Sequence, residues 1–274
     1  MQQISLTVLL SLLLVSGGAP VAMENLTIAH CLQGCPTGTA ASNEIVVRHL
    51  YAVSINQQTR MADWVSYRIL PQSIGVASLL PRRWNNDQLA QNSVRVEELG
   101  TGAATDTLQQ PVLGNQPESV YRITEFTVQA GDQGRLVPMT SFAGTGYWND
   151  LNLVSVMSLM RSDLRLGAWS RLDQAVNALV RSDGELFVIA GPVYQFDGTL
   201  PEAGSSSTPT AFFKVVANQA GAVAAFLFDQ DLPIHASFCA QHTELDTVAE
   251  AAGLALFPAA TEWPLSGLGD RLGC

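Results

Sequence analysis

The stretch from Asp132 to Asp173 constrains the fold more than any other part of the sequence. It reads DQGRLVPMTSFAGTGYWNDLNLVSVMSLMRSDLRLGAWSRLD. A glycine-containing segment at Asp132–Arg135 predicts a turn, and the apolar run near Leu151–Met157 predicts a short strand. A helix is expected to begin near Asp163. Turn, strand and helix therefore follow one another within one short part of the chain.

The helix at the end of this stretch carries the clearest periodic signal. Apolar residues recur at steps of three and four between Gly167 and Arg181, which is the spacing of one face of an amphipathic helix. Asp163 stands where its side chain would cap the first turn. The apolar face consists of Trp169, Leu172, Val176, Leu179 and Val180.

Strand signals lie on both sides of this stretch. The segments are rich in β-branched and aromatic residues, or alternate between apolar and polar, and turn residues separate them. Gly191-Pro192 is expected to end the third strand, and Glu244–Ala252 is expected to form a short helix that stops at Gly253. Antiparallel pairs with interspersed helices indicate the α+β class. The predicted strands are Glu44–Ile55, Asp63–Leu70, Glu185–Ala190, Ala211–Val216 and Ala222–Asp229.

The N-terminus predicts export. An apolar run from Ile4 to Val15 is followed by small residues, and its roughly dozen residues are too few to span a bilayer but suit a secretory signal. We therefore expect a signal peptide at residues 1–22 and one domain over residues 23–274. The mature chain is expected to be secreted or periplasmic, without a membrane anchor.

Four cysteines fit an oxidising compartment. Cys31 and Cys35 are close enough in sequence to close a small loop, and Cys239 and Cys274 would then hold the C-terminal tail to the body. The alternative is a metal pair at Cys31 and Cys35. No second close cysteine pair or His-x-x-x-His spacing completes such a site, so disulfides are the favoured interpretation.

The charge balance bears on possible partners. The formal net charge is −10, and Lys214 is the only lysine, the other cations being arginines. Binding to a polyanion depends on positive charge, so this balance argues against a general nucleic-acid binder. A local arginine cluster in a cleft remains compatible with it.

The Asp132–Asp173 stretch resembles the DNA/RNA non-specific endonuclease family, the ββα-metal nucleases, in its secreted bacterial sugar-non-specific form. The family motif is Asp-Arg-Gly-His, followed by a strand with a Ser-Asn pair. A helix then opens with Asp-Leu-Asn-x-Gly-Ala-Trp and ends with Arg-Leu-Glu. This chain retains Asp132, Gly134, Pro138, Trp148, Leu151, Asn152, Ser155, Ser162–Leu164, Gly167–Trp169 and Arg171-Leu172.

The resemblance covers most of the mature chain. It implies a six-stranded antiparallel sheet flanked by helices, with a nuclease site on one face. Further matching segments are Cys31–Gly38, Val47–His49, Ala62–Val65, Gly191–Tyr194 and Ala225–Gln230.

The resemblance also implies Mg²⁺-dependent phosphodiester hydrolysis, but this chain changes the positions that matter most. Arg135 occupies the position of the general-base His, and Arg165 that of the metal-binding Asn. A guanidinium stays protonated and offers no lone pair, so it can neither accept a proton nor bind Mg²⁺. We therefore expect a degenerate catalytic motif with no confident metal ligand. The remaining family positions hold Gln133 for Arg, Val156 for the second Asn, Asp173 for Glu, and Arg82 as a retained arginine.

Two interpretations of the arginines stay open. Arg135, Arg161 and Arg165 could form an anion-binding pocket, since guanidinium pairs well with phosphate. The favoured alternative is that they form salt bridges with Asp132, Asp163 and Asp173 in place of the metal.

No histidine offers an obvious replacement base. None of the four has a neighbour at metal-ligand spacing, and His49 falls within a predicted strand, which favours a structural role. The four are His30, His49, His235 and His242.

The favoured function is a secreted nuclease homologue with impaired catalysis and a nucleic-acid-binding, anion-binding or regulatory role. Such a protein would bind nucleic acid weakly, and would form a homodimer or pair with an active paralogue. Two alternatives remain: an active Mg²⁺-dependent nuclease with relocated catalytic groups, and a structural or interaction domain without a nucleic-acid role.

Overall fold

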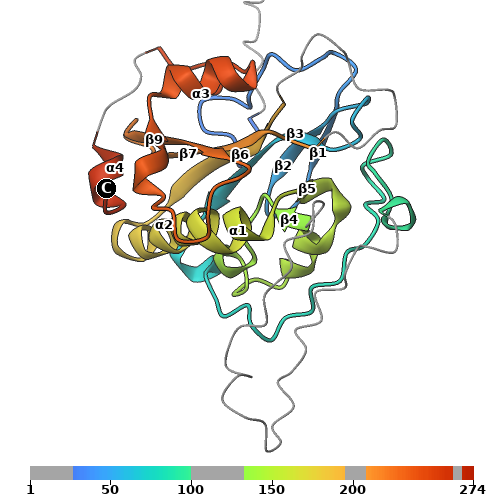
Figure 1. Ribbon diagram of the computed structural model, residues 1–274, viewed down its shortest axis with the longest axis horizontal. Coiled ribbons are helices and arrows are strands. Elements are labelled where there is room, and N and C mark those ends of the chain that lie inside the picture. The colour runs from blue at the N-terminus through green and yellow to red at the C-terminus, as the bar shows by residue number, and fades with distance from the viewer. Residues whose placement is uncertain (1–26, 100–132, 195–207, 262–266) are drawn as a thin grey trace, which may run out of the picture.

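The computed structural model describes residues 27–99, 133–194, 208–261 and 267–274. The signal peptide expected at residues 1–22 lies outside these ranges, as does Asp132. The main sheet is antiparallel and has seven strands in the order β1-β2-β3-β6-β7-β8-β9 (Figure 1). The strands are β1 (Glu44–Val47), β2 (Ala52–Ile55), β3 (Ala62–Ile69), β6 (Leu186–Val193), β7 (Ala211–Ala217), β8 (Val223–Asp229) and β9 (His242–Thr243).

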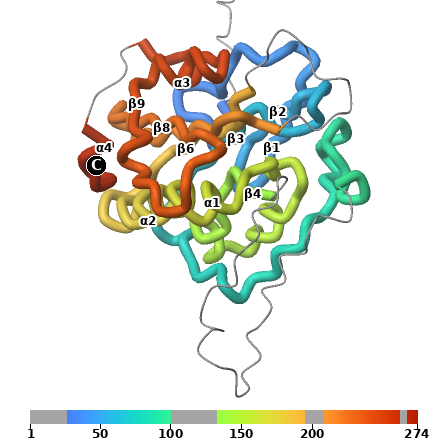
Figure 2. Tube along the Cα trace, in the orientation of Figure 1, coloured from blue at the N-terminus to red at the C-terminus, as the bar shows by residue number. Residues whose placement is uncertain are grey.

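The smaller elements lie on the two faces of this sheet. A second, two-stranded sheet pairs β4 with β5 beside α1 and α2, while α3 covers the opposite face (Figures 1 and 2). The α+β class predicted from the sequence is confirmed, although the sheet has seven strands rather than six. These elements are β4 (Gln133–Arg135), β5 (Met157–Leu159), α1 (Ser162–Leu164), a π turn (Arg165–Trp169), α2 (Ser170–Asp183), α3 (Leu245–Ala252) and α4 (Leu268–Arg271).

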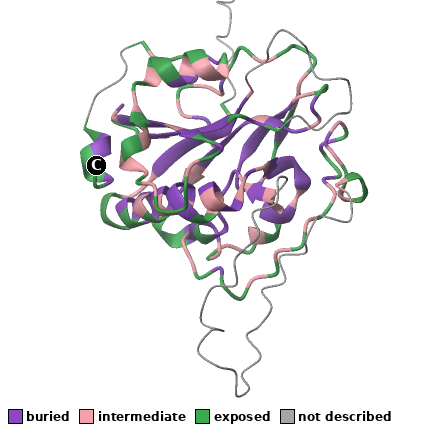
Figure 3. Ribbon diagram, in the orientation of Figure 1, coloured by how far each residue is buried: buried purple, intermediate pink, exposed green. Residues whose placement is uncertain are grey.

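Two apolar clusters, one on each face, hold the layers together. Every residue of β6 and β7 is buried, as expected for central strands covered on both sides (Figure 3). The α2 face predicted from the sequence packs into the first cluster through Trp169, Leu172 and Val176. Val248 and Leu254 join the second cluster at α3.

Two strand predictions were wrong in detail. The segment Glu44–Ile55 forms two strands, because Arg48 N–H donates to Tyr51 O at 2.8 Å and closes a turn between them. Gly191-Pro192 does not end β6. Pro192 lies beyond the last residue paired with β3, so its missing N–H removes no bond on that side. A Cβ on Gly191 would approach Asp63 O to 2.3 Å, so glycine allows the close passage of β6 past β3.

The Asp132–Asp173 stretch also differs from the prediction. Gln133–Arg135 is a strand rather than a turn, and most of Leu151–Met157 forms 3₁₀ turns before β5 begins at Met157. A buried apolar run does not reveal by periodicity alone whether it is strand or helix. Arg161, not Asp163, is the N-cap residue of α1, and no side chain caps it.

Both expected disulfides form. Cys31 pairs with Cys35 and Cys239 with Cys274, at Cα–Cα distances of 4.8 and 5.1 Å. No helix within the described ranges combines the length and apolarity needed to cross a bilayer.

Candidate functional site

The side chain of Arg135, at the end of β4, joins two loops by hydrogen bonds: the loop that contains Arg82 and the segment Leu151-Asn152. This set of bonds is called the Arg135 clamp. Arg135 Nε donates to Leu151 O at 3.1 Å, and its Nη2 donates to Arg82 O at 3.0 Å and to Asn152 Oδ1 at 2.8 Å. The guanidinium also lies 4.3 Å from the ring centroid of Trp84, a cation–π geometry. A permanent cation thus lies at the position where the resemblance predicts the base, and it binds the loop that contains Arg82.

Asn152 completes this clamp from the other side. Its side chain is buried, and its Nδ2 donates to Pro81 O at 3.0 Å and to Asn149 Oδ1 at 3.2 Å. The two loops are also joined by main-chain bonds, including Asn85 N–H to Asn152 O at 2.8 Å. The retained Asn152 therefore has a structural role here.

Replacing Arg135 with Gln is expected to lower the free energy of unfolding by about 1–3 kcal/mol, because it removes donors to partly buried acceptors. Urea unfolding followed by tryptophan fluorescence measures the change. Arg83, which is exposed in the same loop, supplies the control substitution to Gln. Equal free energies of unfolding for Arg135→Gln and Arg83→Gln would contradict a stabilising role for the hydrogen bonds of Arg135.

Neither residue at the two expected asparagine positions suits Mg²⁺, and of these two positions the resemblance gives only that of Arg165 to the metal ligand. Val156 is fully buried in the first apolar cluster and carries no ligand atom. Arg165 begins the π turn and is partly buried, and its guanidinium would repel the ion. Across the described ranges, no group of three His, Cys, Asp or Glu side chains is arranged to hold a metal.

Asp173 at the family Glu position pairs with Lys214 of β7 rather than with an arginine. Both side chains are buried, and Lys214 Nζ also lies 3.7 Å from the centroid of the Trp169 ring. Burial raises the pKa of Asp173, against the opposing effect of Lys214, and lowers the pKa of Lys214. The Asp173 carboxylate is therefore part of a buried ion pair that joins α2 to β7.

The predicted salt bridge between Arg161 and an aspartate of the motif is wrong. Arg161 forms an ion pair with Asp231, not with Asp163, and both side chains are substantially exposed. Asp132 lies outside the described residues, so its predicted pairing stays a prediction. Gln133 is partly buried and sits opposite Leu159 in the β4–β5 ladder.

His49 lies in the turn between β1 and β2 and is not part of a strand. Its side chain is 62% exposed and stacks on Tyr147, with ring centroids 3.9 Å apart and an interplanar angle of 8°. Its Nδ1 is 3.5 Å from Asp150 Oδ2. Asp150 directly precedes Leu151, whose carbonyl binds Arg135, so this exposed group adjoins the altered site.

Sequence reasoning missed Lys214 and the His49–Tyr147–Asp150 group. Lys214 interrupts an otherwise apolar run, and a single lysine inside a predicted strand is a signal for a buried ion pair. The His49 group joins positions about a hundred residues apart, and no local pattern links them.

The glycines retained in the motif have packing roles that do not depend on catalysis. A Cβ on Gly134 would lie 2.7 Å from Met160 Cβ, which would separate β4 from the chain after β5. Gly167 has non-helical backbone angles, and a Cβ there would lie 2.6 Å from Ile234 O. These glycines therefore maintain the backbone packing of the motif.

Three comparisons place the chain among known proteins. A family model described as DNA/RNA non-specific endonuclease matches residues 32–262. The protein named Nuclease from Serratia marcescens is 33% identical over 242 residues, which cover 84% of this chain and 81% of that protein. A solved structure of the EndoG/EndoGI complex, on the mechanism of EndoG inhibition, aligns with a TM-score of 0.54 at 17% identity. That alignment covers 84% of this chain and 90% of the other, and shows a shared fold.

Proposed function

The chain belongs to the DNA/RNA non-specific endonuclease family, and we propose that it is an exported member whose phosphodiesterase chemistry is strongly impaired. Its proposed role is to bind nucleic acid or another phosphate-bearing anion without cutting it, or to regulate an active relative. The paired cysteines and the apolar N-terminal run support export.

The contacts of Arg135 are the observation that most supports impaired catalysis. Arg135 stands where the family has its base, and its guanidinium is committed to Leu151 O, Arg82 O and Asn152 Oδ1. Hydrolysis requires a group that removes a proton from the attacking water, and a guanidinium does not accept one at ordinary pH. Removing one acid–base group typically costs ~10²–10⁴ in rate. Arg165 also stands in place of the expected metal ligand, and Val156 in place of the second asparagine.

The binding role rests on family descent and on arginine chemistry. Arg82 is the retained arginine and Arg165 has replaced the expected asparagine, and guanidinium groups pair with phosphate in two-pronged geometry. Binding is expected to be weak and to depend steeply on salt, because the net charge is −10. The EndoG/EndoGI complex is a case of protein partnering within this fold, and supports a regulatory partner or a dimer as an alternative role.

A nuclease assay tests the loss of activity. The purified mature chain is incubated with plasmid DNA and with RNA in Mg²⁺ or Mn²⁺, and circular dichroism verifies that it is folded. No cleavage is the expected result. Fluorescence polarisation with labelled DNA at low salt then tests binding. Absence of binding even there would favour an interaction domain without a nucleic-acid role.

A second candidate, an active enzyme with a relocated base, is favoured by the exposed His49–Asp150 pair. A carboxylate next to an imidazole orients the ring, and an accessible imidazole can take a proton near neutral pH. If residual nuclease activity exists, His49→Gln is expected to reduce it roughly 10²-fold or more. His242→Gln, on the far edge of the sheet, is the control. Unchanged activity in His49→Gln would eliminate this candidate.

A further inference from the structure

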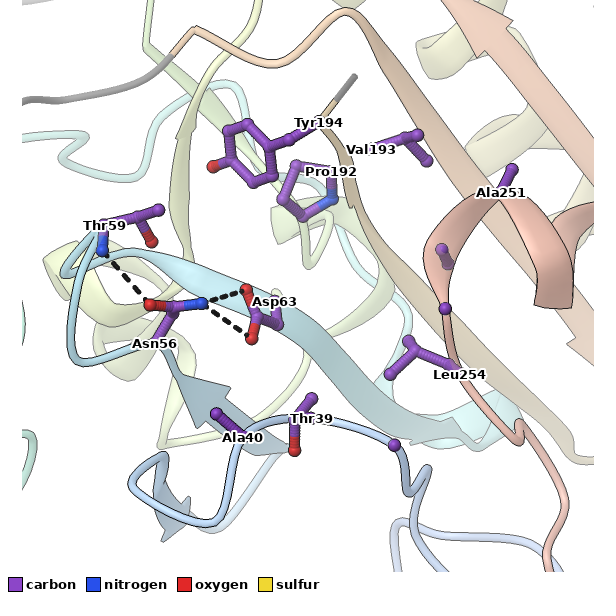
Figure 4. Close-up of a pocket in the computed structure, with 13 residues that line it drawn as sticks. Thr39, Ala40, Asn56, Thr59, Asp63, Pro192, Val193, Tyr194, Ala251 and Leu254 are labelled. Atoms are coloured by element: carbon purple, nitrogen blue, oxygen red, sulfur yellow. Dashed lines mark hydrogen bonds between the residues drawn. The ribbon is translucent and has the colours of Figure 1, made fainter. Parts of the chain in front are cut away.

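A pocket of about 290 Å³ lies next to α3, which covers the opposite face of the main sheet from α2 (Figures 1 and 4). Strands β3 and β6, the segment around Thr39 and the end of α3 surround it. Its walls are mixed, with a carboxylate and hydroxyl groups on one side and apolar side chains on the other. The lining includes Asp63, Asn56, Tyr194, Pro192, Val193 and Leu254.

Asp63 brings a carboxylate to this pocket, and no ion pair links it to a cation among the residues that the structure describes. Its carboxylate accepts from Asn43 Nδ2 at 2.7 Å and from Asn56 Nδ2 at 3.1 and 3.2 Å. All these donors are neutral amides. None of the described residues that line the pocket is Lys, Arg or His. Burial raises the pKa of Asp63, and the two amides only partly oppose this effect.

The Asp63 carboxylate also has acceptor capacity left. Oδ2 accepts from both Asn43 and Asn56, whereas Oδ1 accepts from Asn56 alone. An ionised carboxylate has about four acceptor positions on its two oxygens. Tyr194 lies close by, since the charge of Asp63 contributes to raising the pKa of its phenol. Figure 4 shows Asp63 and Tyr194 on neighbouring sides of the space.

The end of α3 adds to the same negative potential. Ala251 and Ala252 are the last residues of this helix, and both line the pocket together with Gly253. Gly253 has φ 65° and ends the helix in the left-handed conformation. The C-terminal end of a helix carries a partial negative charge from its aligned carbonyls, which stabilises a nearby cation. The carboxylate and the helix end therefore favour a positively charged occupant from two sides.

We propose that this pocket binds a small organic ammonium ion. The ammonium group would donate to Asp63, and a short hydrocarbon body would lie against Pro192, Val193 and Leu254. The volume falls at the lower end of ligand pockets, which suits a molecule of a few heavy atoms. The site stands apart from Arg135 and does not rest on the proposed function.

Calorimetric titration with n-butylammonium chloride tests this proposal. The full mature chain is expected to bind one equivalent with a dissociation constant of roughly 1 mM, which lies below the ceiling of affinity per atom for so small a ligand. n-Butanol has the same shape without the charge, and is expected to bind roughly ten-fold more weakly or worse, because a charge-assisted hydrogen bond is lost. Sodium chloride at matched ionic strength corrects for general screening.

Two variants complete the test. Asp63→Asn keeps the shape and is expected to weaken butylammonium binding roughly ten-fold or more. Ala251→Leu narrows the pocket while leaving Asp63 in place, and is expected to have the same effect even if Asp63→Asn folds poorly. Equal affinity for butanol and butylammonium would overturn the proposal. So would wild-type affinity in either folded variant, or no binding by the wild-type protein well above the millimolar range.

Discussion

Restoring the family residues at the altered site is expected to create Mg²⁺-dependent nuclease activity. The variant carries Arg135→His and Arg165→Asn, with Gln133→Arg and Val156→Asn added. The imidazole would provide a base that titrates near neutral pH, and the amide oxygen introduced by Arg165→Asn would provide a hard ligand. Because the scaffold at Gly134, Gly167 and Trp169 is intact, plasmid cleavage is expected to rise by roughly 10²–10⁴-fold over the unmodified chain.

The matched control for this variant carries Arg135→Ala in place of Arg135→His and is otherwise identical. It loses the same clamp but gains no base, so it separates restored chemistry from a loosened loop. The control is expected to stay near the activity of the unmodified chain. Cleavage by both variants would show that the cleft, not the base, limits activity. A folded and inactive restored variant would mean that the cleft no longer admits its substrate.

Removing Lys214 is expected to have the largest effect on stability. Lys214→Met leaves the buried Asp173 carboxylate without its cation, and breaking a buried ion pair from one side costs about 3–5 kcal/mol. Lys214 also contacts the face of Trp169, so the substitution removes a cation–π contact as well. Denaturant unfolding at neutral pH measures the loss.

The double variant Lys214→Met with Asp173→Leu tests the cause. Replacing both partners with apolar residues removes the unpaired charge, and such replacements are often neutral or stabilising. Most of the lost stability is therefore expected to return. Arg161→Met, which breaks the exposed pair with Asp231, should cost less than about 1 kcal/mol. A double variant as unstable as Lys214→Met would show that packing, rather than charge, accounts for the loss.

The long periodic elements were predictable from the sequence. The face of α2 through Trp169 and Val176, the hairpin of β7 and β8, and the end of α3 at Gly253 all follow from local patterns. The turn at Arg48–Tyr51 was not predictable in this way, because the segment Glu44–Ile55 contains no Gly, Pro, Asn or Asp to mark a turn. The continuation of β6 through Pro192 was not predictable either, because it depends on pairing with β7.

The candidate site also has features that could be predicted from the sequence and features that could not. The identity of the altered positions, Arg135 and Arg165 above all, came from ordered matches along one short stretch. The hydrogen-bond partners of these arginines could not be predicted from the sequence, because a guanidinium can pair with any acceptor that the fold brings near it. Arg135 thus binds backbone carbonyls and Asn152 rather than a carboxylate among its described contacts, and Asp173 meets Lys214 from a distant strand.

Calorimetric titration of the purified chain with Mg²⁺ tests the central claim most directly. The guanidinium of Arg165 offers Mg²⁺ no lone pair, so the wild-type chain is expected to give no binding heat beyond dilution. The variant Arg165→Asn, measured alongside, is expected to give a saturable signal. Stoichiometric Mg²⁺ binding by the wild-type chain, lost on addition of a chelator, would contradict the account.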